Sequence, residues 1–381
     1  MLKIATFDWI NLNNIFYNLH SSSQFIMKIH NFSAGPAILP KSVLEEAAQA
    51  ILNFNNRGLS ILEVSHRGKD IIAVVDEAEA LIKEFLGVGE DYKVLFLTGG
   101  ASTQFFMVPM NLLNENETAA YLNTGVWADK AIEQALDYGT VDVVASSKDS
   151  NYTFIPKDYI VKPGTKYLHY TSNNTVYGTQ FHHVPAVPEG CLLVADMSSD
   201  IFCRPVDGNK FDLIYAGAQK NLGPAGVTIV IVKKSILGTL TRKIPTMLDY
   251  RVHVKNESMY NTPPVYPIYV TMLTLRWIKA MGGLSAMERR NREKASLLYA
   301  EIDRNPYFEG TTAVEDRSWM NATFLADSPE HEAAFTAYCK ANGVDGIAGH
   351  RSVGGFRASM YNAMDLDAVK FLVELMQNFK P

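Results

Sequence analysis

The sequence has few cysteines, no long apolar run and no basic block, and each shortage excludes a class of protein. Its three cysteines, Cys191, Cys203 and Cys339, lie far apart without CxxC spacing, so we expect reduced thiols in a cytoplasmic protein and neither a disulfide framework nor a metal site. No apolar run approaches the roughly 20 residues that a membrane-spanning helix needs. The formal net charge of −5, with no cluster of Lys and Arg, argues against nucleic-acid and membrane-surface partners.

What is present is the composition of an ordinary enzyme, with 47% hydrophobic and 20% charged residues in a chain of 381. This length suffices for a large core and favours two domains. Residues 1–26 differ from the rest, and they lack the compact apolar stretch and cleavage site of a secretory signal. A second methionine, Met27, follows them. We interpret residues 1–26 as a disordered or non-native extension; the alternative is an amphipathic arm that packs on a partner.

Short apolar segments alternate with helical patterns through the first two thirds of the chain. Helical spacing of apolar residues appears at 44–52, 71–85, 102–113 and 126–136. Apolar segments typical of strands buried on both faces are residues 93–98, 119–122, 141–145, 166–170, 191–195, 212–215 and 227–232. The alternation predicts an α/β domain in which helices cover a mostly parallel, seven-stranded sheet.

The pattern changes after about residue 283. A long charged helical stretch at 284–303 precedes short strand-like pieces and helical patterns near 329–341 and 365–379. We interpret residues 286–381 as a smaller C-terminal α+β domain. The large domain then spans residues 27–285, with an N-terminal arm at 27–40.

Two polar residues follow predicted strands and point to cofactor chemistry, because ligands of such sheets collect beyond the carboxyl ends of the strands. Lys220 lies among small residues, and its amine can form an imine with an aldehyde cofactor. Asp196 ends an apolar strand, where burial without a cation is costly and a protonated pyridine nitrogen is a suitable partner. The alternatives are a solvated loop lysine and an aspartate that caps Ser198 and Ser199.

A glycine-rich turn at residues 99–103 leads from a predicted strand into a predicted helix. Backbone N–H groups at a helix start bind phosphate, and the helix dipole assists. The turn lacks the GxGxxG spacing of dinucleotide-binding proteins, which argues against a nicotinamide-dependent oxidoreductase. Trp127, after a second glycine turn, has a ring that can stack on a flat cofactor; core packing is the alternative.

Two His-Arg pairs lie in loops rich in glycine and serine, His66 with Arg67 and His350 with Arg351, and Arg357 follows the second pair. Arginine binds carboxylate and phosphate groups through two parallel hydrogen bonds. We therefore expect an anion site, with surface salt bridges as the alternative.

Residues 27–381, more than nine-tenths of the chain, resemble the phosphoserine aminotransferases, which are class V aminotransferases of the fold type I pyridoxal-phosphate enzymes. The matching segments are residues 31–36 (NFSAGP), 65–67 (SHR), 123–127 (NTGVW), 172–178 (SNNTVYG), 195–199 (ADMSS), 218–226 (AQKNLGPAG), 260–264 (YNTPP) and 349–355 (GHRSVGG). The segment around Lys220 and the Asn-Thr-Pro-Pro segment are specific to the family, whereas the glycine turn is not.

The resemblance implies a role for each candidate residue. Lys220 would hold pyridoxal 5'-phosphate as a Schiff base and move the substrate proton, and Asp196 would pair with the ring nitrogen. The other implied cofactor contacts are Trp127, Thr175, Ala101, Ser102 and Gln219, with Asn261 and Thr262 reaching the phosphate from the neighbouring subunit of a homodimer. Arg67 and Arg351 would bind substrate carboxylates, and His66, His350 and Arg357 the substrate phosphate.

The implied reaction is reversible amino transfer from L-glutamate to 3-phosphohydroxypyruvate, which gives O-phospho-L-serine and 2-oxoglutarate. In the family this serves serine biosynthesis, and in many bacteria pyridoxine biosynthesis as well. Two positions depart from some members, Ser102 in place of arginine and Ala34 in place of serine, and both concern substrate contacts. The alternatives are a class V transaminase acting on glyoxylate, a cysteine desulfurase, for which Cys339 is the only and poorly placed candidate, and a non-catalytic protein that kept the fold.

Overall fold

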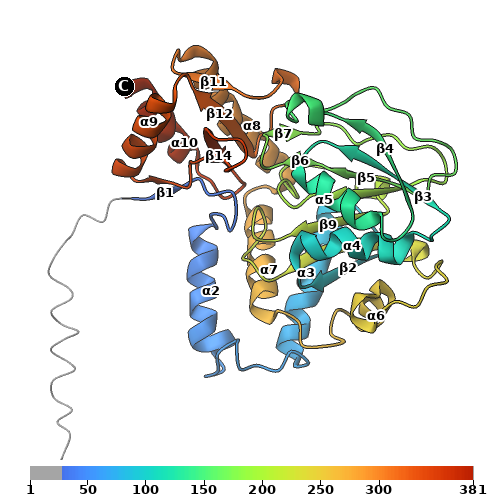
Figure 1. Cartoon of the computed structure of the whole chain (residues 1–381). Helices are drawn as coiled ribbons and strands as arrows, with labels where there is room; N and C mark the ends of the chain where they lie inside the picture. Colours follow the sequence, from blue (N-terminus) through green and yellow to red (C-terminus); the bar gives the residue numbers. More distant parts are fainter. Residues whose placement is uncertain (1–27, 381) are drawn as a thin grey trace, which may run out of the picture.

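The computed structural model describes residues 28–380, so the extension expected at residues 1–26 lies outside the described residues. The chain forms a large domain around a seven-stranded sheet and a smaller domain that contains the C-terminal helices (Figure 1). Both predicted parts are therefore present, and the fold class is confirmed.

The large sheet has the strand order β2-β10-β9-β8-β5-β3-β4. Its strands are β2 (Tyr92–Leu97), β10 (Thr228–Lys233), β9 (Leu213–Gly217), β8 (Leu192–Asp196), β5 (Tyr167–Thr171), β3 (Thr118–Asn123) and β4 (Thr140–Ser146). Strand β10 runs antiparallel to β2 and β9, and the other neighbouring pairs are parallel. The seven predicted segments match these seven strands.

Helices cover both faces of this sheet, because the strands bury side chains on either side. Leu193 and Ala195 of β8 belong to the core under α2 (Lys41–Asn53), α3 (Lys69–Leu86) and α7 (Val265–Ala280). Val194 belongs to the opposite core, under α4 (Gly100–Leu112), α5 (Val126–Ala135) and α6 (Tyr250–Lys255). Each fully buried aliphatic side chain contributes about 1.5–3 kcal/mol, so the two cores hold the layers together.

Helix α7 is the main element that periodicity does not predict. Nine of its sixteen residues are buried, because it packs against α2, α3 and α8 as well as the sheet. A helix buried on most sides lacks the polar face that makes a helical pattern visible in a sequence.

The smaller domain has the α+β composition that the sequence indicates. Its antiparallel sheet contains β11 (Phe308–Gly310), β12 (Asn321–Ala326) and β14 (Phe356–Ser359), in the order β11-β12-β14. Helices α8 (Gly283–Arg304) and α9 (Pro329–Ala341) pack on it, and α10 (Leu366–Asn378) packs against α8. Helix α9 begins with a capping hydroxyl, since Ser328 accepts a hydrogen bond from the backbone N–H of His331.

The N-terminal arm bridges the two domains. Strand β1 (His30–Asn31) pairs in parallel with β13 (Val344–Asp345), and Phe32 is part of the smaller domain's core. Residues 30–32 of the arm, grouped with the large domain from sequence, therefore pack on the smaller one. The chain then crosses over, and the N–H of Ala37 donates to the carbonyl oxygen of Gln219 at 2.9 Å. This crossing brings the arm onto the segment that carries Lys220.

Three further observations concern the expected absences. Within residues 28–380, no helix is both long enough and apolar enough to cross a membrane. The part of the chain that the structure describes contains no group of His, Cys, Asp and Glu side chains arranged for a metal ion. The three cysteines are buried and unpaired.

Candidate active site

The sequence-predicted aspartate and lysine lie at the same edge of the large sheet. Asp196 is the last residue of β8, and Lys220 follows β9 by three residues. Strands β8 and β9 are parallel neighbours, so their carboxyl ends open into one crevice. Each group also influences the pKa of the other through its charge, which places the two side chains in one electrostatic environment.

Lys220 is half-buried and has no ion-pair partner within 4 Å among residues 28–380. Its Nζ donates to Thr175 Oγ1 at 2.9 Å and lies 5.4 Å from the centroid of the Trp127 ring. Burial lowers the pKa of Lys220 to about 8; the charge of Asp196 opposes this effect and the charge of Arg357 adds to it. A much larger fraction of this amine is therefore unprotonated near neutral pH than in an ordinary lysine.

Asp196 is 3% exposed and forms no ion pair within 4 Å in the described part of the chain. Its Oδ1 accepts a hydrogen bond from the N–H of Ser198 at 2.9 Å, so the capping contact considered from sequence does occur. Burial raises the pKa of Asp196, while Ser198 and the charge of Lys220 oppose the rise. A buried carboxylate whose hydrogen bonds come from Ser198 alone, with no cation within 4 Å, is suited to a positively charged ligand.

The turn before α5 brings Trp127 to the crevice. Trp127 is half-buried, and its Nε1 is buried without a hydrogen-bond partner. Gly125 leaves room for the side chain of Asn174, because a Cβ at position 125 would lie 2.6 Å from Asn174 Oδ1. Asn174 in turn donates to the hydroxyls of Thr124 and Thr179, each at 3.1 Å. The turn is thus tied to β6 (Asn173–Asn174) and β7 (Thr179–Gln180), next to Thr175.

The glycine turn ends β2 and starts α4, as predicted. Gly99 and Gly100 have φ angles of +95° and +68°, a region that favours glycine. Ala101 and Ser102 occupy the first turn of α4, where backbone N–H groups have no helical acceptors. The Gln219 side chain folds over Gly217, since a Cβ there would lie 2.7 Å from Gln219 Oε1.

Arg357, on β14 of the smaller domain, is a cation whose charge lowers the pKa of Lys220. Its Nη1 donates to the carbonyl oxygen of Thr175 at 3.4 Å, and burial lowers its pKa. His350 is close enough to feel the charge of Arg357. Burial lowers the pKa of His350 most, and the charges of Arg357 and Arg351 lower it further. Arg351 itself is exposed. The structure therefore brings these three residues together, and Arg357 is joined to Thr175, the residue that also binds the Lys220 amine.

Among residues 28–380, four other candidates make no hydrogen bond or ion pair with the residues around Lys220. Arg67 is exposed and its Nε donates to His66 Nε2 at 3.2 Å; in residues 28–380 no hydrogen bond joins this pair to the Lys220 region. Asn261 and Thr262 are exposed and line a cavity of about 180 Å³ together with Gly99.

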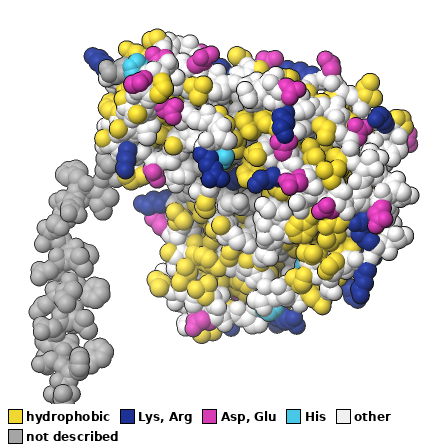
Figure 2. All heavy atoms as spheres, viewed as in Figure 1, with side chains coloured by type: hydrophobic (Ala, Val, Ile, Leu, Met, Phe, Trp, Pro, Cys, Tyr) yellow, Lys and Arg dark blue, Asp and Glu magenta, His cyan; other side chains and the backbone are white. Residues whose placement is uncertain are grey.

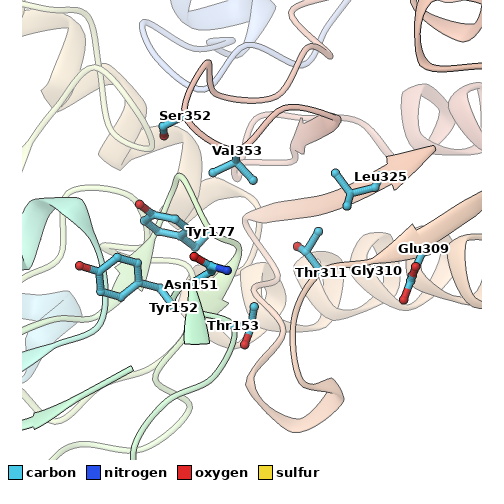
Figure 3. A pocket seen from close by; sticks show the side chains of 10 residues that line it. All are labelled: Asn151, Tyr152, Thr153, Tyr177, Glu309, Gly310, Thr311, Leu325, Ser352 and Val353. Atoms are coloured by element: carbon cyan, nitrogen blue, oxygen red, sulfur yellow. The ribbon is translucent and has the colours of Figure 1, made fainter. Parts of the chain in front are cut away.

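A larger cavity of about 490 Å³ lies between the domains. Figure 3 shows Tyr152 and Tyr177 of the large domain facing residues of the smaller-domain sheet, with Ser352 and Val353 on the loop above. The tyrosine ring centroids are 4.6 Å apart. Because Ser352 Oγ is 2.6 Å from His350 Nδ1, the cavity adjoins the loop that carries His350 and Arg351. Tyr177, Ser352 and Val353 lie in the motifs at residues 172–178 and 349–355, but no motif marks the other walls, which come from distant segments.

The N-terminal arm closes the site near the lysine, and spacing along the chain does not reveal this. A Cβ at Gly35, whose φ is +140°, would lie 3.1 Å from Lys220 Cγ. The carbonyl oxygen of Ala34 accepts a hydrogen bond from the Tyr361 hydroxyl at 2.7 Å. The contiguous motif at residues 31–36 was the one signal in the sequence that pointed to this segment.

Comparisons with known proteins agree with this geometry. Residues 29–372 match the family model described as aminotransferase class-V. The phosphoserine aminotransferase of Flavobacterium johnsoniae is 58% identical over 352 residues, which are 92% of this chain and 98% of that protein. The phosphoserine aminotransferase of Bacteroides fragilis is also 58% identical, over 93% of this chain and 99% of its own.

Solved structures show the same relationship. The phosphoserine aminotransferase from Bacillus circulans subsp. alkalophilus is 47% identical with a TM-score of 0.89, covering 92% of this chain and 98% of its own. The PLP-bound phosphoserine aminotransferase from Trichomonas vaginalis is 38% identical with a TM-score of 0.87, covering 92% of this chain and 100% of its own. The chain therefore belongs to the class-V aminotransferases, within the phosphoserine aminotransferase family.

Proposed function

We propose that this protein catalyses reversible, pyridoxal-phosphate-dependent transfer of an amino group from L-glutamate to 3-phosphohydroxypyruvate, which gives O-phospho-L-serine and 2-oxoglutarate. The observation that carries the proposal is that Lys220 and Asp196 lie at one sheet edge and each acts on the other's pKa, while neither has an ion-pair partner within 4 Å among the described residues. Serine biosynthesis follows from this reaction. A role in pyridoxine biosynthesis and a cytoplasmic location complete the proposal.

The residues present fit the cofactor. The unpaired carboxylate of Asp196 suits a protonated pyridine nitrogen. Trp127 suits the face of a ring, and the free N–H groups at Ala101 and Ser102 suit a phosphate. Gln219 adds a side-chain donor beside this turn. When bound, the cofactor supplies an aldehyde for the lysine amine and a ring that withdraws electrons from the substrate.

The chain's own residues then position and protonate the substrate. Lys220, with its lowered pKa, removes the proton from the substrate Cα and returns it as a general acid. Thr175 keeps the amine in place through the 2.9 Å hydrogen bond. The same residue's backbone carbonyl accepts from Arg357, so one residue holds the base and one cation together.

The substrate anions are assigned by their distance from the reacting carbon. An α-carboxylate is bonded to the carbon that carries the amino group, so its partner must lie close to Lys220. Arg357 is that cation, and a half-buried guanidinium suits two-point binding. His350 and Arg351, farther out on the loop, then suit the phosphate. This exchanges the roles that the family resemblance implied for Arg351 and Arg357.

The active form is proposed to be a homodimer. Exposed apolar side chains occur on α2, on the segment after it and at the start of α3, namely Leu44, Ile51, Leu52, Leu59, Leu62 and Ile72. Figure 2 shows hydrophobic side chains gathered on the lower part of the face on which Figure 1 draws α2. Large exposed apolar patches typically mark association surfaces. Pairing there would let the exposed Asn261 and Thr262, with His66 and Arg67, complete the neighbouring subunit's site.

Steady-state kinetics test the substrate. We expect kcat/KM for O-phospho-L-serine with 2-oxoglutarate to exceed that for L-serine by at least about 100-fold, because a site with buried or clustered cations loses several kcal/mol when its anion is missing. Equal efficiency with the two amino acids, or a preference for glyoxylate as acceptor, would instead identify a different class-V transaminase.

A further inference from the structure

Thr171 lies directly beside Asp196 in the sheet. Strands β5 and β8 are parallel neighbours, and their register pairs Thr171 with Asp196. Alternation along the strands places both side chains on the face covered by α4 and α5, since Tyr167 of β5 and Val194 of β8 belong to that core. Neighbouring strands lie about 4.8 Å apart, so side chains in register on one face are within reach of a hydroxyl-to-carboxylate hydrogen bond.

The Thr171 hydroxyl has no partner in the described structure. Thr171 is 3% exposed, and its Oγ1 is buried without a hydrogen bond. An unsatisfied buried hydroxyl costs about 1–3 kcal/mol, and such groups in native proteins usually have a role. The next residue differs, because the hydroxyl of Ser172 donates to the Asp196 backbone carbonyl at 3.0 Å and also to Asp200.

The other neighbour of Asp196 is already engaged. Tyr215 pairs with Asp196 from β9, but its hydroxyl is 2.8 Å from His169 Nε2, and both residues are buried. The carboxylate of Asp196 receives a hydrogen bond from the backbone N–H of Ser198. Of the two side chains that flank Asp196 in the sheet, only Thr171 therefore has a free donor.

We propose that Thr171 is a positioning residue that donates its hydroxyl hydrogen bond to the Asp196 carboxylate when a cationic ring nitrogen is bound. This inference rests on the proposed role of Asp196. A buried carboxylate with few donors tends to take up a proton, which would remove the charge that holds the ring nitrogen protonated. A donor besides Ser198 keeps Asp196 ionised and aimed at the ring, so Thr171 acts on the cofactor through its neighbour.

The test compares Thr171→Val, which keeps the shape and removes the hydroxyl, with Thr171→Ser, which keeps the hydroxyl. Thr312→Val is the matched control, because Thr312 is also buried with an unpartnered Oγ1 but lies in the smaller domain. Two quantities are measured, the dissociation constant of pyridoxal phosphate and the pH midpoint of the bound cofactor's absorbance. Asp196→Asn is measured in parallel to test the assignment of Asp196 itself.

We expect Thr171→Val to weaken cofactor binding about tenfold, the size of one hydrogen bond to a charged group. The absorbance midpoint should move to higher pH, because with less positive charge held at the ring the Lys220 nitrogen keeps its own proton longer. Thr171→Ser and Thr312→Val should stay within about twofold of the parent. If Thr171→Val folds poorly, Thr171→Ala, which also lacks the hydroxyl, takes its place.

Two results would overturn the inference. One is a hydroxyl-free variant with parental affinity and midpoint, and the other is Thr171→Ser behaving like Thr171→Val, which would indicate packing alone. If Asp196→Asn also keeps the parental affinity and midpoint, the assignment of Asp196 fails as well. If only Asp196→Asn changes them, the function stands and the role of Thr171 does not.

Discussion

The amino group of Lys220 donates a hydrogen bond to the hydroxyl of Thr175 at 2.9 Å, in a crevice where no carboxylate pairs with the amine within 4 Å among residues 28–380. A lysine held by a neutral hydroxyl loses its proton more easily than one held by a carboxylate. In the proposed reaction, this relationship suits the amine to act as a nucleophile and as a base.

The first prediction concerns the pH dependence of cofactor uptake. The unprotonated amine reacts with the aldehyde, and the pKa of Lys220 is lowered to about 8. The rate at which cofactor-free enzyme takes up pyridoxal phosphate should therefore rise with pH through a midpoint near 8. Stopped-flow absorbance measures this rate. A rate still rising steeply well above pH 9 would mean that Lys220 behaves as an ordinary lysine.

Arg357 should influence both the amine and the substrate. Its charge lowers the pKa of Lys220, so Arg357→Gln should move the uptake midpoint to higher pH. The same variant should raise KM for L-glutamate by at least about tenfold, because a charge-assisted contact to the carboxylate is lost. Arg351→Gln is the control, with a smaller effect on the midpoint. A larger glutamate defect in Arg351→Gln would restore the roles implied by family resemblance.

Gly125 should be required for steric reasons. A Cβ at this position would lie 2.6 Å from Asn174 Oδ1, and overpacking of this kind costs about 1–3 kcal/mol. We expect Gly125→Ala to weaken cofactor binding about tenfold by displacing the turn that carries Trp127. Gly89→Ala is the control, since a Cβ at position 89 would lie 3.3 Å from the flexible carboxylate of Asp91 and meet nothing closer. Equilibrium titration with the cofactor measures the dissociation constant of each variant. Parental affinity in Gly125→Ala would show that the turn accommodates the methyl group.

Asn173 should stabilise the contact between the domains. Its side chain donates to Ser199 and Asn321, each at 2.8 Å, and accepts from Ser318 at 2.5 Å. Asn173→Ala should lower the free energy of unfolding by about 2–4 kcal/mol, since three buried hydrogen bonds are lost. Asn378→Ala, at the exposed end of α10, should change it by less than about 0.5 kcal/mol. Urea unfolding measures both, and equal effects would contradict the prediction.

The proposed dimer predicts that a charge on α2 separates the subunits. Leu52 is 76% exposed in one chain, and Leu52→Arg should yield a monomer with at least about tenfold lower activity, because burying an unpaired charge is costly. Val314→Arg, at a side chain 70% exposed on the smaller domain, should leave the assembly intact. Light scattering gives the mass, and a parent protein that is monomeric at assay concentration would refute the dimer.

Some of the fold and site was predictable because it depends on local pattern. The seven strand segments and the glycine turn were visible in runs of adjacent residues, and Asp196 with Lys220 marked the ends of two such runs. Lys220 and Gly35 lie far apart along the chain, so neither side-chain periodicity nor motif spacing indicates that they are in contact. Helix α7 was missed because burial on most sides removed its polar face.

The sequence by itself determined where the seven strand segments and most of the helices lie along the chain, the sheet edge at which polar residues collect, and the chemistry that an amine and a carboxylate permit there. Only the tertiary structure decided which cation lies beside Lys220, which strand neighbours flank Asp196, and where the N-terminal arm packs. The reason is physical: local elements follow from side-chain periodicity and turn residues, whereas contacts between distant segments depend on how complete layers pack against one another.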